Sequence, residues 1–99
     1  MRPYRNLKIS DLVQKELSKL LIRELDFEGA FVTITSVHVA EDLLQAVVIL
    51  GIIPHERGPM VFAKLEEKRR LLQHLLLKKM NIRPMPTLRF QIQEPESVK

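Results

Sequence analysis

From Phe31 to Ile53 the chain reads FVTITSVHVAEDLLQAVVILGII, with two runs of β-branched and apolar residues. Such residues favour extended backbone, so residues 31–39 and 45–53 are predicted to be strands. The short polar link Ala40-Glu41-Asp42-Leu43 joins them as a hairpin, which makes the two strands antiparallel. The second run is apolar on both of its alternating faces, and this favours a central strand with a neighbour on each side.

A helix is predicted upstream of the hairpin, over residues 7–25. Asn6 is expected to be its N-cap, and Gly29 lies just past its end, where a chain reversal is easiest. The apolar residues of this segment recur at steps of three and four, which places them on one face of a helix. These residues are Ile9, Leu12, Val13, Leu17, Leu20, Leu21 and Leu25.

A second helix is predicted over residues 59–80, after a loop that holds two prolines and a glycine. Pro59 suits the first position of a helix, and Asn81 is expected to end it. Its apolar arc consists of Val61, Phe62, Leu65, Leu72, Leu76 and Met80.

Arg69 falls inside this apolar arc. A straight helix would bury its guanidinium group, so either the side chain extends to the rim or the helix bends near Lys68-Arg69-Arg70. A bend or an interruption is expected within about two residues of this site.

Residues 87–93 are predicted to be the last strand, because Leu88, Phe90 and Ile92 alternate with polar residues. The element order is therefore α-β-β-α-β. A strand, a helix and a following strand usually form a right-handed parallel crossover. We expect one α+β domain, residues 1–99, with a three-stranded mixed sheet, both helices on one face, and a flexible tail at 94–99. Phe31, Phe62 and Phe90 are expected in its core.

Several functional classes are disfavoured by composition. The 99 residues suffice for a single core, and the chain has no Cys and only three His. The histidines lack metal-ligand spacing, and the serines lack a Gly-x-Ser-x-Gly context. Apolar runs are too short to span a membrane. We expect a cytoplasmic, monomeric protein without catalytic residues, metal, cofactor or small-molecule substrate.

Positive charge is concentrated in one part of the chain, whose net charge is +4. Residues 57–89 hold nine Lys/Arg against two Asp/Glu, whereas residues 1–56 hold six Lys/Arg against eight Asp/Glu. A single surface cation is usually only solvated, but a cluster attracts phosphate. The cluster therefore indicates a nucleic-acid partner.

Three segments resemble the ribosome-binding factor A family. They are Lys15-Glu16-Leu17 with Arg23-Glu24-Leu25, the hairpin from Val32 to Val48, and Ile82-Arg83-Pro84-Met85-Pro86-Thr87-Leu88-Arg89-Phe90. The Asp-Leu-x-x-Ala turn and the final Arg-x-x-Pro-x-Leu-x-Phe are the most specific parts. The similarity covers residues 5–90.

The resemblance implies a type II KH-like RNA-binding domain that binds the immature 30S subunit and its 16S rRNA. It also implies a role in late maturation and rRNA processing, and in cold adaptation. Family members carry Ala-x-Gly at a helix kink, where this chain has Lys68-Arg69-Arg70. Glycine would let RNA approach the backbone closely, and in this chain we expect long cationic side chains to replace that contact.

The candidate RNA-binding residues follow from the cluster and the resemblance. They are Lys64, Lys68, Arg69, Arg70, Lys78, Lys79, Arg83 and Arg89, with Arg2, Arg5 and Lys8 as further contacts. Two other hypotheses remain. One is a protein-binding α/β adaptor without RNA affinity that uses the apolar second strand as its surface; the other is a small hydrolase, for which the sequence offers no converging polar groups.

Overall fold

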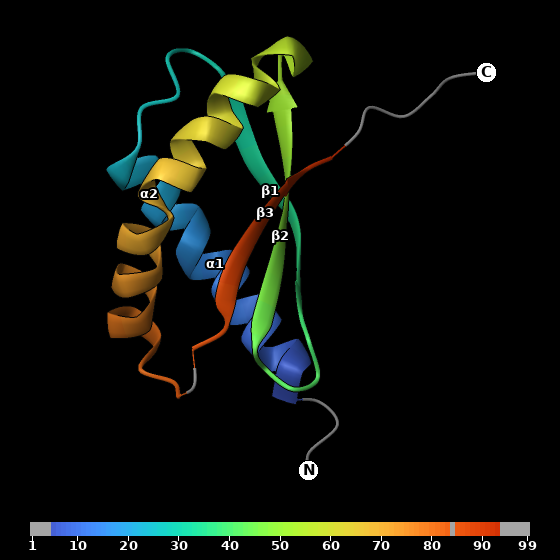
Figure 1. Cartoon of the computed structure of the whole chain (residues 1–99), viewed down its shortest axis with the longest axis vertical. Coiled ribbons are helices and arrows are strands. Elements are labelled where there is room, and N and C mark those ends of the chain that lie inside the picture. Colours follow the sequence, from blue (N-terminus) through green and yellow to red (C-terminus); the bar gives the residue numbers. More distant parts are fainter. Residues whose placement is uncertain (1–4, 84, 94–99) are drawn as a thin grey trace, which may run out of the picture.

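A computed structural model describes residues 5–83 and 85–93 (Figure 1). The predicted α-β-β-α-β order is confirmed, with a short 3-10 turn added before the second helix. The predicted tail and Arg2 lie outside the described residues. The elements are α1 (Arg5–Glu24), β1 (Phe31–Val39), β2 (Gln45–Ile53), η1 (His55–Arg57), α2 (Gly58–Met80) and β3 (Thr87–Ile92).

The three strands form one mixed sheet in the order β1-β2-β3. β1 pairs antiparallel with β2, and β2 pairs parallel with β3, as the crossover argument predicts. Both helices lie on the same side of the sheet (Figure 1), so its other side, the open face, is not covered by a helix. The described residues thus form two layers.

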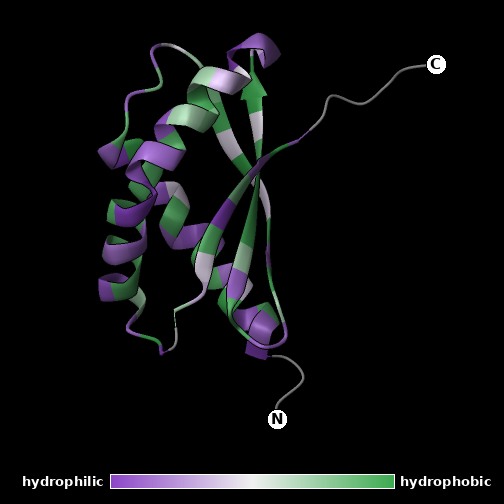
Figure 2. Cartoon of the chain, in the orientation of Figure 1, coloured by the Kyte–Doolittle hydropathy of each residue, from purple (hydrophilic) through white to green (hydrophobic). Residues whose placement is uncertain are grey.

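The core lies between the helices and the inner face of the sheet. On β2, Ala46, Val48 and Leu50 are fully buried toward the helices, while Val47 and Ile49 on the open face are half-buried. Figure 2 shows apolar colour on the sheet and on the helix sides that face it, with hydrophilic colour on the outer sides of the helices. Burial under the helices accounts for the apolar residues of the inner face of β2, whereas Val47 and Ile49 are apolar although no helix covers the open face.

Two of the three expected core phenylalanines are exposed. Phe90 is only 7% exposed, but Phe31 is 75% exposed and Phe62 is 37% exposed. The pairing of β1 with β2 is irregular between Ile34 and Ser36, and this reverses the alternation of inward and outward side chains along β1. Residues before Ile34 therefore face the opposite side from the one that strict alternation counted back from Val39 predicts. Phe31 therefore faces outward, a feature that alternation alone does not predict.

The start of α1 also differs from the prediction. Because the helix begins at Arg5, Asn6 lies inside it and is not an N-cap. Its side-chain amide instead donates a 3.2 Å hydrogen bond to the carbonyl of Val39. After the end of α1, Gly29 has a φ of 91° and makes the expected chain reversal. Asn81 ends α2 in the left-handed conformation, also as expected.

Gln73 ties α2 to β3. Its side-chain amide donates to the carbonyl of Pro86, and its oxygen accepts the N–H of Leu88 at 2.9 Å. The nitrogen and the oxygen of one side-chain amide thus both bind the backbone at the start of β3 and hold it against α2.

Candidate nucleic-acid interface

The helical layer carries most of the positive charge. α1 contains five Lys/Arg and three Asp/Glu, and α2 contains six Lys/Arg and two Asp/Glu. β1 and β2 contain none of these residue types, and β3 contains only Arg89. Most acidic residues of the segment 1–56 lie outside α1, between the helices and strands. α1 is therefore itself cationic, although the net charge of residues 1–56 is negative.

The outer side of α2 presents an exposed row formed by Arg70, His74 and Lys78. Residues four apart stand one above the other on a helix, about 6 Å apart. Within residues 5–83 and 85–93, neither Arg70 nor Lys78 forms an ion pair, so both charges are available to a ligand. His74 was not among the predicted site residues, although its spacing of four from Arg70 and Lys78 is evident in the sequence.

Three of the candidate cations are already paired with carboxylates. Lys64 Nζ lies 3.0 Å from Glu28, Lys79 Nζ lies 3.8 Å from Glu16, and Arg69 Nε lies 3.5 Å from Glu66. Solvent-exposed pairs of this kind contribute about 0–1 kcal/mol to stability. They also lower the positive potential that a phosphate meets at these positions.

The structure resolves the alternatives for Arg69. α2 is helical without interruption from Gly58 to Met80, so of the two expected outcomes, a bend or an interruption, the interruption does not occur. The helix axis does change direction near its middle (Figure 1). Arg69 is half-buried at the rim, while Lys68 and Arg70 are exposed.

The remaining candidates are dispersed. Arg83 is exposed after α2, and Arg5 and Lys8 are exposed at the start of α1. Arg89 is exposed between buried Leu88 and Phe90, which places it on the open face, away from the helical layer. The predicted residues therefore occupy two sides of the molecule rather than one continuous site.

The described residues offer neither a metal site nor a membrane-spanning helix. In residues 5–83 and 85–93 no group of three or more His, Cys, Asp or Glu could hold a metal ion. No helix in that part of the chain is long and apolar enough to cross a membrane. For the adaptor hypothesis, the inner face of β2 is buried, whereas Val47 and Ile49 lie half-buried on the open face.

The sequence profile described as "Ribosome-binding factor A" matches residues 5–97. The chain belongs to the ribosome-binding factor A family. It is 40% identical to ribosome-binding factor A of Cupriavidus necator over 87 residues, which cover 87% of this chain and 70% of the relative. Membership makes the chain a ribosome-binding factor of ribosome biogenesis.

Solved structures of ribosome-binding factor A share the KH-like fold. The crystal structure of the Thermus thermophilus factor matches with a TM-score of 0.76 at 20% identity, over 90% of this chain and 97% of that one. A homology model of the Thermus thermophilus factor, fitted into the cryo-EM map of a 30S complex, matches with a TM-score of 0.72 at 22% identity. That match covers 83% of this chain and 88% of the other.

Proposed function

We propose that this chain binds the immature 30S subunit through its 16S rRNA and assists late maturation in the cytoplasm without catalysing a reaction. The observation that carries the proposal is the cationic outer side of the helical layer in a member of the ribosome-binding factor A family. The fitted Thermus thermophilus relative, which was placed in a 30S complex, supports the same partner.

The outer row of α2 is the centre of the proposed interface. Lys and Arg that contact phosphates release condensed counterions, and this electrostatic term dominates affinity for structured RNA. Arg70 and Lys78 are unpaired among the described residues and lie on one side of one helix, so a single RNA backbone can reach both. Lys68, Arg83, Arg5 and Lys8 are exposed outside this row and would make separate contacts, and the ion-paired Lys64, Arg69 and Lys79 contribute less.

The experiment compares two variants with equal loss of charge. Replacing Arg70 and Lys78 with Gln should weaken binding to immature small subunits by about tenfold or more and should flatten its salt dependence by roughly two contacts. The matched control replaces Lys15 and Lys19 with Gln, and its effect should be smaller. Co-sedimentation with purified subunits at several salt concentrations measures both variants, and circular dichroism confirms that they are folded.

Two outcomes contradict the proposal in different ways. Equal losses in the two variants would mean that the chain binds as a diffuse polycation without a located site. Unchanged binding of the Arg70 and Lys78 variant would move the interface away from α2, for example to Arg89 on the open face.

A further inference from the structure

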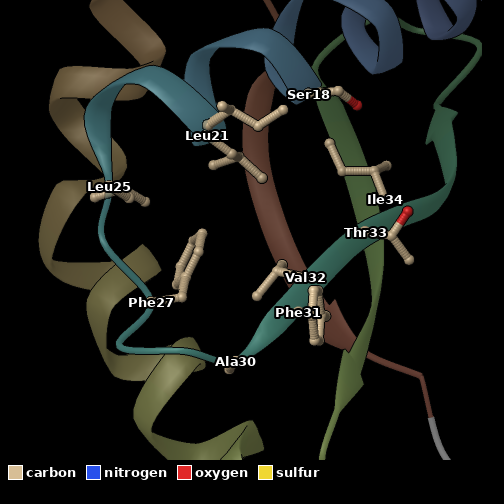
Figure 3. Close-up of a pocket in the computed structure, with 10 residues that line it drawn as sticks. Ser18, Leu21, Leu25, Phe27, Ala30, Phe31, Val32, Thr33 and Ile34 are labelled. Carbon is tan, nitrogen blue, oxygen red and sulfur yellow. The ribbon is translucent and has the colours of Figure 1, made fainter.

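The irregular pairing of β1 puts an aromatic ring on the open face of the sheet. Val32 and Ile34 pack against the core, so Phe31 and Thr33 face away from the helices. Figure 3 shows the side chain of Val32 turned toward Phe27 and that of Thr33 turned the other way. Phe31 is 75% exposed, and its ring can therefore contact a ligand on this face.

Two further planar groups lie at one level of the open face. His38 of β1 pairs with Val47 of β2, and Val47 pairs with Arg89 of β3, so the imidazole and the guanidinium flank one valine. Adjacent strands are about 4.8 Å apart, which puts the Cα atoms of His38 and Arg89 roughly 10 Å from each other. Both residues are exposed, and neither forms a salt bridge within residues 5–83 and 85–93.

Apolar and amide side chains lie between these planar groups. Val47 and Ile49 are half-buried and form an apolar floor along the centre of the face. Gln91 of β3 pairs with Ile49, and the side-chain oxygen of Gln93 is 4.0 Å from the position where a Cβ of Gly51 would stand. Each amide offers both donors and an acceptor, so hydrogen-bonding groups border the apolar floor.

The charge of the open face favours an anionic ligand. The three strands contain no Asp or Glu, and Arg89 is their only Lys/Arg. Glu41 and Asp42 lie in the hairpin turn beyond His38, and the carboxylate of Asp42 accepts the N–H of Leu44 at 3.0 Å. On the strands themselves, an anion therefore meets a cation and no carboxylate.

Planar groups beside amides match unpaired RNA bases. Single-stranded RNA is bound by stacking its bases on aromatic rings, imidazoles and guanidinium planes, and by hydrogen bonds to the edges of the bases. A double helix keeps its bases stacked inside, so it cannot use the planar groups of this face. A protein partner would bury the guanidinium of Arg89 and several amides, each of which would need a partner group. Unpaired bases supply such groups on their edges and cover the apolar floor with their rings.

We propose that the open face binds about two or three nucleotides of single-stranded RNA by stacking their bases. One base stacks on Phe31 and another on the planes of His38 and Arg89, while Gln91 and Gln93 bind base edges. At about 3.3 Å per residue, Phe31 and His38 lie roughly 20 Å apart along β1, which leaves room for bases between them. The inference rests on the proposed function, since its partner is RNA, but it uses the side of the sheet opposite α2.

The test uses the isotope-labelled full chain and two RNA ligands, a short oligouridylate and a duplex of the same length. Oligouridylate should shift the amide signals of Thr33, Val47 and Gln91 in NMR spectra with a Kd on the order of 0.1–1 mM. The duplex should leave these three signals unchanged, because its bases are not available for stacking.

Variants of two planar residues separate stacking from charge. Phe31→Ser should weaken oligouridylate binding by about fivefold or more, whereas Phe31→Tyr keeps a ring and should bind as the parent chain does. Arg89→Lys keeps the charge but loses the guanidinium plane, and it should weaken binding by about two- to fivefold. Leu12→Ser is the control, since Leu12 is an exposed apolar residue on α1, away from the open face, and it should change nothing.

Several results would overturn this inference. Without shifts of the open-face amides at millimolar oligouridylate, the face is not an RNA site. Equal shifts with the duplex or with inorganic phosphate would reduce it to a phosphate contact, and unchanged binding of Phe31→Ser would exclude stacking on the ring. Shifts on simple concentration of the chain would make a second copy the occupant. None of these results bears on co-sedimentation with small subunits, whose failure would instead refute the proposed function.

Discussion

Ser10 shows how one hydroxyl group can connect two elements. It is the buried polar residue of the described core, at 7% exposure. Its oxygen accepts the N–H of Val39 at 3.1 Å and donates to the carbonyl of Asn6 at 2.8 Å. The hydroxyl therefore satisfies the strand edge at the point where α1 crosses it.

Replacing Ser10 with Ala should lower the free energy of unfolding by about 1–3 kcal/mol, because the buried N–H of Val39 loses its partner. Ser18→Ala is the control on the same row of α1, and its effect should be within about 0.5 kcal/mol. Urea denaturation of the two variants measures the difference. Equal stability of both would show that water replaces the hydroxyl at Val39.

Among the elements, α2 carries the cationic triplet Lys68-Arg69-Arg70 near its middle, which bears on its stability. The resemblance predicted a kink at Lys68-Arg69-Arg70, and the helix is continuous through these residues while its axis changes direction near its middle (Figure 1). Glycine inside a helix costs about 1 kcal/mol relative to alanine. The triplet Lys68-Arg69-Arg70 contains no glycine and therefore avoids this cost.

Arg70→Gly should consequently be less stable than Arg70→Ala by about 1 kcal/mol in thermal or urea unfolding. Both variants lose the same charge, so they should bind small subunits equally at a temperature where both are folded. If the two are equally stable, the backbone at Arg70 is not under helical constraint, and the continuous helix described above is wrong there.

How far sequence predicted these elements depends on whether a pattern is local. Three local patterns depend only on which face of an element is buried: the three- and four-residue spacing on α1, the apolar run of β2 and the alternation around Phe90. These patterns predicted the order of the elements, the pairing of the strands and the two layers. The exposure of Phe31 depends on an irregularity at Ile34 and Ser36, and no residue type in β1 predicts that irregularity. The role of Asn6 depends on Val39, 33 residues away, and local capping rules do not contain that contact.

The candidate site was predicted in composition but not in arrangement. Arg70 and Lys78 were among the expected residues, and their helix could be assigned from its pattern. Whether a cation is free or paired depends on distant carboxylates, as with Lys79 and Glu16. Arg89 was predicted as an RNA-binding residue because it belongs to the basic segment of the sequence. Its alternation with buried Leu88 and Phe90 already indicated that it faces away from the helices.

For the molecule as a whole, charge is divided between its parts. The helices hold eleven Lys/Arg against five Asp/Glu, while the stretch between Arg23 and Arg57 is wholly acidic in its charged residues. A molecule with such an asymmetry is oriented by the field of a polyanion before contact.

Raising the salt concentration should therefore slow association with small subunits more than it speeds dissociation. Rapid-mixing fluorescence at several ionic strengths separates the two rates. A salt effect confined to the dissociation rate would exclude orientation by the field.

The parallel pairing of β2 with β3 has a consequence for the order in which the chain acquires its structure. β1 can join β2 as soon as the hairpin has been synthesised, but Thr87–Ile92 follows only after all of α2. At about 5–20 residues per second, a nascent chain leaves one side of its most apolar strand without a neighbour for roughly 2–7 s. During that interval α2, which is held by its own local hydrogen bonds, can already pack against the inner face of β2. Its Gln73 carries the amide nitrogen and oxygen that later bind the backbone at the start of β3.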